Sequence, residues 1–341
     1  MRTMKAIYID GPGRISLRNT PAPVITEDDD VILKICYTGI CGSDLHAYLG
    51  ENPFVIYPRV FGHEFCGKVI SAGRGVTDLS PGDLVVGEPI EYCGECYPCR
   101  RGHPNVCEKL KVLGVHADGG GREYIKMSRR HVFKVPDTLP AKYAVLAEPL
   151  TIGFRCCTRG EVAPDDCVLI MGAGTIGLCA MLAAKQKGAT VIITDLIDEK
   201  LAYAANMGAD HVINAGLEDV TARVLELTDR RGANVVVDGV GSKKSLEQAI
   251  DLASAAGRIV ELNLTNQISE ITHKKLCQRD LTLCGTRLQA HEFPEAIDYL
   301  CSHWENMTDF ITDMYPPERA EEAFEHMLKN GRNVRKLLIS F

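Results

Sequence analysis

A glycine-rich turn near the middle of the 341-residue chain constrains its fold more than any other feature. Gly172, Ala173, Gly174, Thr175, Ile176 and Gly177 follow the apolar run 167–171 and open a segment with helical periodicity. In this context the first glycine permits a tight turn, the second lets backbone approach a pyrophosphate, and the third packs helix on strand. The helix N-terminus offers free N–H groups to phosphate oxygens. The motif predicts a dinucleotide-binding βαβ unit, with a ligand-free glycine-rich turn as the alternative.

The residues after this motif favour one cofactor. Asp195 ends the next apolar run, about twenty residues on, where a carboxylate accepts hydrogen bonds from ribose hydroxyls. A carboxylate there repels a 2′-phosphate, so Asp195 favours NAD over NADP, although Lys200 is close enough to weaken that preference. Val240 completes the predicted cofactor-binding residues.

The order of apolar runs predicts two domains, which the chain length also favours. Residues 167–284 hold six apolar runs with helical segments among the first five, which predicts a doubly wound parallel sheet. The first 150 residues instead hold short strands separated by Gly, Pro and Asp turns, the pattern of an antiparallel barrel. The last run, 335–341, could return to that first domain. We therefore expect residues 1–150 and 290–341 to form one domain and residues 151–289 the other.

A cluster of metal-ligand side chains lies between residues 39 and 64. Cys41, His63 and Glu64 supply a thiolate, an imidazole and a carboxylate, which can hold a tetrahedral zinc with one position open. Ser43 and His46 lie close enough to handle a proton released there, and Asp44 would hold His63 through its second ring nitrogen. Taken singly, each would more often be a core or surface residue, but the grouping predicts a catalytic metal site.

Four further cysteines form a second group. Cys93, Cys96, Cys99 and Cys107 can close a tetrahedral all-thiolate site, which predicts a structural zinc. The alternatives are an iron–sulfur cluster, for which the last spacing is unsuitable, and a disulfide pair. Such a zinc would stabilise a loop without taking part in chemistry.

Composition excludes several classes of protein. The net charge of −7 and the absence of a basic cluster argue against a nucleic-acid partner. No run of about 18 apolar residues suggests a membrane span, and the N-terminus does not have the pattern of a signal peptide. With fourteen clustered cysteines, these features favour reduced thiols, bound metal and a cytoplasmic location.

A hydride acceptor together with an open metal site points to one class of reaction. Zinc would lower the pKa of a substrate hydroxyl while hydride passes from carbon to the nicotinamide. Ser43, a ribose hydroxyl and His46 would form the exit route for the proton. Glu148 precedes a proline in an apolar setting, where a buried carboxylate is costly unless it is paired or near a metal. A helix N-terminal role is the alternative for Glu148.

Over nearly its full length the chain resembles the zinc-dependent medium-chain dehydrogenases. The matching segments are Gly39 to His46, Gly62-His-Glu64, the four-cysteine lobe and Gly172 to Gly177. The resemblance implies a GroES-like β-barrel catalytic domain, a Rossmann domain, one catalytic and one structural zinc, NAD and a homo-oligomer, dimer or tetramer. It assigns Cys41 and His63 as zinc ligands, with either Glu64 or Glu148 as the third.

Finer motifs resemble one branch of that family. Glu148 stands where many alcohol dehydrogenases place a second cysteine and sorbitol dehydrogenases a glutamate. The segments from Tyr57 and from Leu113 are similar to those of bacterial sugar-acid dehydrogenases, which oxidise a secondary hydroxyl of hexonates such as L-gulonate or L-galactonate. The resemblance implies His116 and Arg287 as substrate contacts, with a loop or interface role as the alternative for each. A threonine or amino-alcohol dehydrogenase, and a non-catalytic binding relative, are the competing functions.

Overall fold

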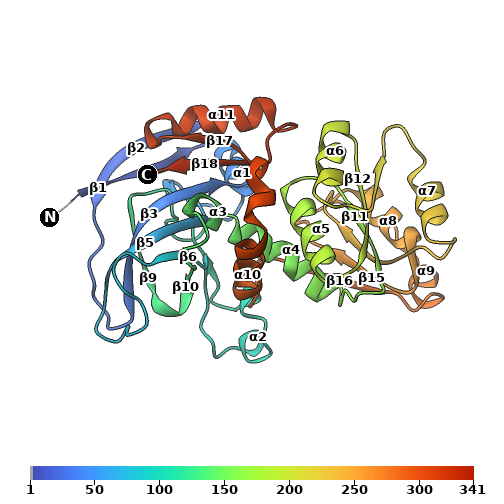
Figure 1. Ribbon diagram of the computed structural model, residues 1–341, viewed down its shortest axis with the longest axis horizontal. Helices are drawn as coiled ribbons and strands as arrows, with labels where there is room; N and C mark the ends of the chain where they lie inside the picture. The colour runs from blue at the N-terminus through green and yellow to red at the C-terminus, as the bar shows by residue number, and fades with distance from the viewer. Residues whose placement is uncertain (1–2) are drawn as a thin grey trace. The chain divides into compact units, whose positions relative to one another are not determined.

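The computed structural model describes residues 3–341 (Figure 1). The chain forms two compact units, which are described separately here. Unit 1 contains the chain up to Glu148 together with Phe293–Phe341, and unit 2 contains Pro149–Glu292. The boundaries thus fall after residues 148 and 292, where the sequence suggested 150 and 289.

Unit 1 is built mainly of antiparallel strands. Its larger sheet follows the order β10-β6-β5-β3-β18-β17, and β9 pairs with β3 as well. These strands are β3 (Asp30–Ile40), β5 (Glu64–Ala72), β6 (Leu84–Gly87), β9 (Tyr124–Ser128), β10 (Val132–Lys134), β17 (Ile311–Tyr315) and β18 (Lys336–Ser340). The smaller sheets contain β1 (Thr3–Gly11), β2 (Arg14–Pro21) and β4 (Arg59–Val60), and separately β7 (Ile90–Glu91) and β8 (Lys111–Val112).

The C-terminal segment is an integral part of unit 1. Strand β18 pairs antiparallel with β3, so that Leu338 lies opposite Gly39. Helix α11 (Ala320–Asn330) places Phe324 in the same core as Phe61 and Leu337, with the two phenylalanine rings 5.2 Å apart. The other helical segments of unit 1 are α1 (Gly42–Leu49), α2 (Tyr97–Arg100), η1 (Pro104–Val106), η2 (Arg129–His131), α3 (Ala141–Ala144), α10 (Phe293–His303), η3 (Trp304–Phe310) and η4 (Pro317–Arg319).

Unit 2 is the predicted doubly wound parallel sheet. Its strands are β11 (Cys167–Met171), β12 (Thr190–Asp195), β13 (His211–Asn214), β14 (Ala233–Asp238), β15 (Ala253–Glu261) and β16 (Thr282–Gly285). They are all parallel and follow the order β13-β12-β11-β14-β15-β16, in which the chain reverses direction of winding after β13. Ligands in such sheets bind outside the carboxyl ends of the strands, at this reversal point.

Helices cover both faces of that sheet (Figure 1). On one face, Val224 and Ala249 pack with Leu169 and Ile192 of the sheet in a single core. On the other, Gly153 lies so close to the backbone of Cys179 that an added Cβ would come within 2.3 Å of it. The helices are α4 (Ala147–Arg159), α5 (Thr175–Gln186), α6 (Asp198–Asn206), α7 (Val220–Leu227), α8 (Lys243–Leu252) and α9 (His273–Cys277).

Candidate metal centre and cofactor site

The start of helix α1 positions the first metal-ligand side chain. Cys41 is the N-cap residue between β3 and α1, and its N–H donates to Oδ2 of Asp44 at 2.9 Å. This contact satisfies an otherwise free donor at the helix start. It also fixes the cysteine relative to the buried Asp44 carboxylate. Ser43 and His46 follow in the first and second turns of the same helix.

A glycine-rich loop positions His63 and Glu64. Gly62 has a φ of +96°, a conformation that side chains disfavour. Residues 119–121 then run against its backbone: Gly119 N–H donates to Val60 O and Gly120 N–H to Gly62 O, at 2.8 and 2.7 Å. A Cβ at Gly119 would lie 2.1 Å from Gly62 O, so only glycine permits this approach. The loop therefore holds the segment that carries His63 in place.

Cys41, His63 and Glu64 converge on one point inside unit 1. A ligand atom from each lies within 4.8 Å of the other two. His63 Nε2 is 3.5 Å from Ser43 Oγ and its Nδ1 is 3.6 Å from Asp44 Oδ1, so Asp44 faces the second ring nitrogen. Burial lowers the pKa of His63, but the negative charges of Asp44 and Cys41 outweigh that effect and raise it well above 6.5. A half-buried thiolate together with a buried imidazole and carboxylate suits a divalent cation such as zinc.

Glu148 borders this centre but stands outside the three-residue set. Its side chain is buried, and the charges of His63 and Glu64 act on it. Burial is the main cause that raises the pKa of Glu148 to about 7, and the neighbouring Glu64 carboxylate adds to the effect. Within residues 3–341 the geometry thus places Glu64, rather than Glu148, with Cys41 and His63.

The structure adds Lys336, which the sequence did not predict as a site residue. Its side chain on β18 is buried, and its Nζ lies 2.6 Å from both Oε1 and Oε2 of Glu64. Burial disfavours the ammonium, but the charges of Glu64 and Cys41 outweigh it and raise the pKa of Lys336. The signal in the sequence was a lysine at the start of the apolar run 335–341, which by itself suggests only a solvent-facing position.

The four-cysteine lobe forms a second, separate cluster. Ligand atoms of Cys93, Cys96, Cys99 and Cys107 lie within 4.8 Å of one another. Backbone N–H groups of Glu95 and Cys96 point to Cys93 Sγ at 3.5 and 3.4 Å, an arrangement that stabilises thiolates. All fourteen cysteines are free, so the disulfide alternative is not realised. A closed set of four sulfurs with no other donor is typical of a structural metal.

The glycine-rich turn in unit 2 has the geometry that the motif requires. Gly172 has a φ of +98°, and a Cβ at Gly177 would lie 1.9 Å from Gly172 O. A Cβ at Gly174 would meet nothing within 4 Å, which leaves room for a phosphate group. Asp195 Oδ2 accepts the N–H of Ala173 at 2.8 Å, so Asp195 braces the turn.

Of the remaining cofactor-site predictions, Val240, Thr175 and Ile176 lie at this turn, and Lys200 lies on α6. Val240 follows β14 and is 54% exposed, and its Cγ2 would lie 3.5 Å from a Cβ at Gly172. Thr175 and Ile176 form the first turn of α5, and Lys200 lies half-buried on α6.

The two predicted substrate contacts lie in different units. His116 in unit 1 accepts the N–H of Val112 through Nδ1 at 3.1 Å, and its ring lies 6.1 Å from that of Phe54. Arg287 in unit 2 is half-buried in the segment after β16. A substrate contact stays a prediction for both residues.

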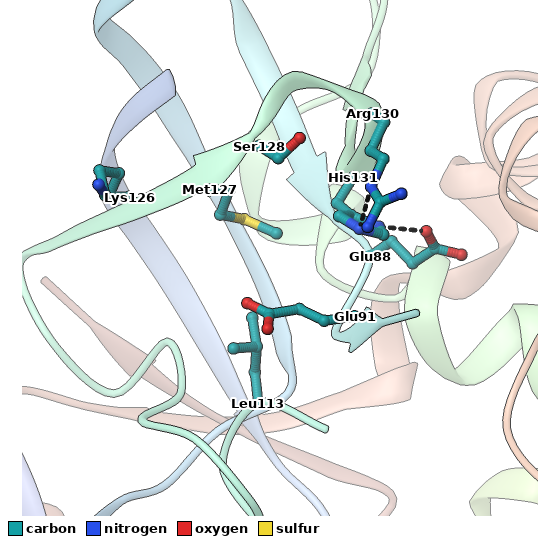
Figure 2. Close-up of a pocket in the computed structure, with 8 residues that line it drawn as sticks. All are labelled: Glu88, Glu91, Leu113, Lys126, Met127, Ser128, Arg130 and His131. Carbon is teal, nitrogen blue, oxygen red and sulfur yellow. Dashed lines mark hydrogen bonds and ion pairs between the residues drawn. The ribbon is translucent and has the colours of Figure 1, made fainter. Parts of the chain in front are cut away.

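A cavity of about 100 Å³ in unit 1 is lined by none of the residues of the two candidate metal sites (Figure 2). His131 at its edge is held on both ring nitrogens, by Glu88 Oε2 at 2.7 Å and by Arg130 Nε at 2.9 Å. None of Cys41, His63 and Glu64 lines it. Because this histidine is already fully paired, we interpret the Glu88–His131 contact as structural.

Comparison with known proteins places the chain in a family. Residues 27–137 match the alcohol dehydrogenase GroES-like domain, and residues 175–302 match the zinc-binding dehydrogenase domain. An uncharacterised zinc-type alcohol dehydrogenase-like protein of Haemophilus influenzae is 40% identical over 98% of both chains. Sorbitol dehydrogenase of Bacillus subtilis is 32% identical over 99% of this chain and 97% of its own. L-galactonate-5-dehydrogenase of Escherichia coli is 30% identical over the whole of both.

A solved structure agrees with both units. The RspB alcohol dehydrogenase of E. coli CFT073, in complex with NADH, is 35% identical with a TM-score of 0.92 over 99% of both chains. The chain therefore belongs to the zinc-binding alcohol dehydrogenase family and is an oxidoreductase with a GroES-like domain and a Rossmann domain. More particularly, it is a zinc-dependent medium-chain dehydrogenase similar to the polyol and sugar-acid dehydrogenases. The predictions of this family and fold, and of zinc and a nicotinamide cofactor, are confirmed.

No helix among residues 3–341 combines the length and apolar character needed to cross a membrane.

Proposed function

We propose that the enzyme oxidises a secondary hydroxyl of a polyol or sugar acid, such as L-gulonate or L-galactonate, to the ketone, with NAD as hydride acceptor. One observation carries this proposal: the buried metal centre combines a single thiolate, Cys41, with two carboxylates, Glu64 and Glu148. The names of two relatives support it: the B. subtilis protein is a sorbitol dehydrogenase and the E. coli protein an L-galactonate-5-dehydrogenase.

Each residue of the centre would have a separate role in metal binding or in orienting a metal ligand. When bound, zinc would acidify the substrate hydroxyl and the nicotinamide would accept hydride. Cys41 and His63 would hold the metal, with Glu64 as the third donor and Asp44 fixing the orientation of His63. Glu148 is buried beside these residues and would place a second carboxylate next to the metal.

Ser43 and His46 would carry the released proton to solvent. Ser43 Oγ lies 3.5 Å from His63 Nε2, at the edge of the centre, and His46 is exposed on the same helix. Glu51 folds back onto His46, with its N–H bonded to His46 O at 2.8 Å and its Oε2 2.7 Å from His46 Nδ1. That contact leaves Nε2 as the ring nitrogen that takes up the proton.

The preference for NAD over NADP would rest on Asp195. Its carboxylate stands at the carboxyl end of β12, where a ribose 2′-hydroxyl is favoured and a 2′-phosphate is repelled. We expect Asp195→Ala to weaken NAD binding by about tenfold and NADP binding less, as measured by fluorescence titration. An unchanged ratio of the two dissociation constants would remove Asp195 from the recognition of the ribose.

The substrate class is tested by initial rates of NAD reduction. The panel contains polyols, the hexonates L-gulonate and L-galactonate, and threonine, with zinc content measured on the same sample. Turnover of a hexonate or polyol with about two zinc ions per chain supports the proposal. Turnover of threonine alone replaces the substrate class with amino alcohols. Two zinc ions without any turnover across the panel contradict the polyol and sugar-acid assignment.

We also propose a homo-oligomer in a reducing, cytoplasmic compartment. Strand β16 ends the sheet of unit 2, and its Leu283 is 40% exposed, so the strand edge is available for pairing with another chain. All fourteen cysteines are free thiols, which agrees with a reducing environment. Light scattering after size-exclusion chromatography would give the assembly state, and a monomer at micromolar concentration contradicts the oligomer.

A further inference from the structure

Lys336 is unusual among the lysines of this protein because its whole side chain is buried. It is the only lysine among residues 3–341 in the buried class, with 3% of its surface exposed. The strand that carries it lies beside β3, which leads directly into Cys41. Buried lysines are rare unless they are paired, so its position calls for a partner of opposite charge.

That partner is a residue of the metal centre. Lys336 Nζ lies 2.6 Å from each carboxylate oxygen of Glu64, which is itself 1% exposed. The space for the Glu64 carboxylate is made by Gly39 on the neighbouring strand, where a Cβ would come 2.2 Å from Oε2. The backbone therefore directs Glu64 towards the ammonium as well as towards Cys41 and His63.

The charges around Lys336 show what this ammonium does. The negative charges of Glu64, Cys41 and Glu148 act on the Lys336 ammonium. The Asp44 carboxylate adds a further negative charge to the cluster, since it acts on Glu148 and His63. Such a concentration of negative charge in a buried site needs positive charge, which a bound dication supplies. In the absence of the metal, the ammonium of Lys336, 2.6 Å from Glu64, supplies it instead.

We propose that Lys336 is an internal counter-cation of the catalytic metal centre, which stabilises the metal-free site and competes with zinc for Glu64. The inference rests on the proposed assignment of Cys41, His63 and Glu64 to the metal. Because a cation beside a dication repels it, the same contact weakens zinc binding. Lys336 thereby makes folding of unit 1 less dependent on the catalytic zinc than a cluster of anions alone would be.

The test compares Lys336→Met with the wild-type holoenzyme, and no substrate is needed. We expect Lys336→Met to hold the catalytic zinc at least about tenfold more tightly in competition with a chelator. We also expect removal of that zinc to lower its melting temperature more than it lowers that of the wild type. Cys41→Ser protein, which would retain only the zinc of the cysteine lobe, supplies the baseline for both measurements.

Two further variants identify the contact responsible. Lys5→Met removes an exposed lysine that lies at the same 2.6 Å from a carboxylate, that of Glu318, and should change neither property. In the Glu64→Gln background, Lys336→Met removes the ammonium after its partner charge has gone. In that background, Lys336→Met should no longer increase zinc retention against the chelator. It should also no longer enlarge the fall in melting temperature on zinc removal.

Three results would overturn the inference. Zinc retention and metal-dependent melting could be unchanged in Lys336→Met, zinc could be held more weakly, or the effects could persist in full with Glu64→Gln. If Lys336→Met protein is recovered only when zinc is supplied, and Lys336→Met/Glu64→Gln is recovered without it, the inference is supported. Failure of the proposed substrate class is recognised separately, because the zinc effects would stand while the panel of alcohols remained unreacted.

Discussion

The two candidate metal sites of unit 1 are built in opposite ways. Cys93, Cys96, Cys99 and Cys107 come from a single stretch of fifteen residues, and all four ligands are sulfur. The proposed catalytic centre takes Cys41, the pair His63 and Glu64, the bordering Glu148 and finally Lys336 from separate segments of the chain. The comparison shows that a site made of four identical ligands can be formed by one short segment. A site that combines ligands of different charge with a counter-cation requires several distant segments to fold together.

The largest difference between the two groups should appear in turnover. Replacing Cys41 by Ser or His63 by Ala removes a ligand that no neighbour replaces, so we expect kcat/KM to fall by about 1,000-fold or more. Zinc content should fall from two ions to one per chain, and NAD binding should stay within about twofold. Activity close to that of the wild type in either variant would refute the metal assignment.

The corresponding change in the lobe should affect stability instead. Cys93→Ser opens a four-sulfur site, and we expect the free energy of unfolding to fall by about 3 kcal/mol or more. Turnover per zinc-loaded catalytic centre should change by no more than about threefold. Chemical denaturation and metal analysis on one preparation measure both quantities. A Cys93→Ser protein of normal stability would contradict a structural metal in the lobe.

The two groups should also differ in how stability depends on pH. The pKa of Glu148 is raised to about 7 from 4.5, chiefly by burial, so the folded state binds its proton more tightly than the unfolded state. The stability from this group is fully present below pH 4.5 and is lost as the pH rises towards 7. In the Cys41→Ser background, we expect about 3 kcal/mol to be lost across this window.

Glu148→Gln should abolish that loss, as measured by denaturation at pH 5 and pH 8. The exposed Glu95 in the lobe provides the contrast, because a hydrogen bond from Lys109 lowers its pKa. Glu95→Gln should therefore leave the loss of stability between pH 5 and 8 in place. A pH dependence that is the same with and without Glu148 would show that its carboxyl group is not strained by burial.

The smallest effects should come from glycines. A Cβ at Gly39 would lie 2.2 Å from Glu64 Oε2, so Gly39→Ala must displace that buried carboxylate and should cost about 2 kcal/mol. Gly102 in the lobe has a φ of +79° and open space around it. Gly102→Ala should therefore cost only about 1 kcal/mol, through backbone strain. Equal costs in thermal denaturation would mean that Glu64 moves freely away from Gly39.

The same contrast explains what the sequence could predict. The lobe and the glycine-rich turn depend on short spacings, so Cys93 to Cys107 and Gly172 to Gly177 were recognisable without tertiary information. Asp195 followed from a strand end at a fixed distance from the turn. In unit 2 the central strands β11 and β14 are buried on both faces, which makes their apolar runs easy to identify.

Lys336 could not be predicted because its environment arises from strand pairing. Its role requires that β18 return beside β3, and that Gly39 leave room for Glu64 between them. A single lysine at the start of an apolar strand has the same sequence signature whether it faces solvent or a buried carboxylate. For the same reason, no local pattern could predict that Glu64, rather than Glu148, lies within 4.8 Å of the ligand atoms of Cys41 and His63.

The interrupted path of unit 1 has a consequence for biosynthesis. Residues 149–292 form unit 2 as one continuous segment, so it can fold as soon as that segment has left the ribosome. Unit 1 cannot be completed until β18 has been synthesised, since that strand fills its place beside β3. A nascent chain would thus acquire its nucleotide-binding fold first and its full metal centre last. A polypeptide that lacks β18 would therefore lack the complete proposed metal centre.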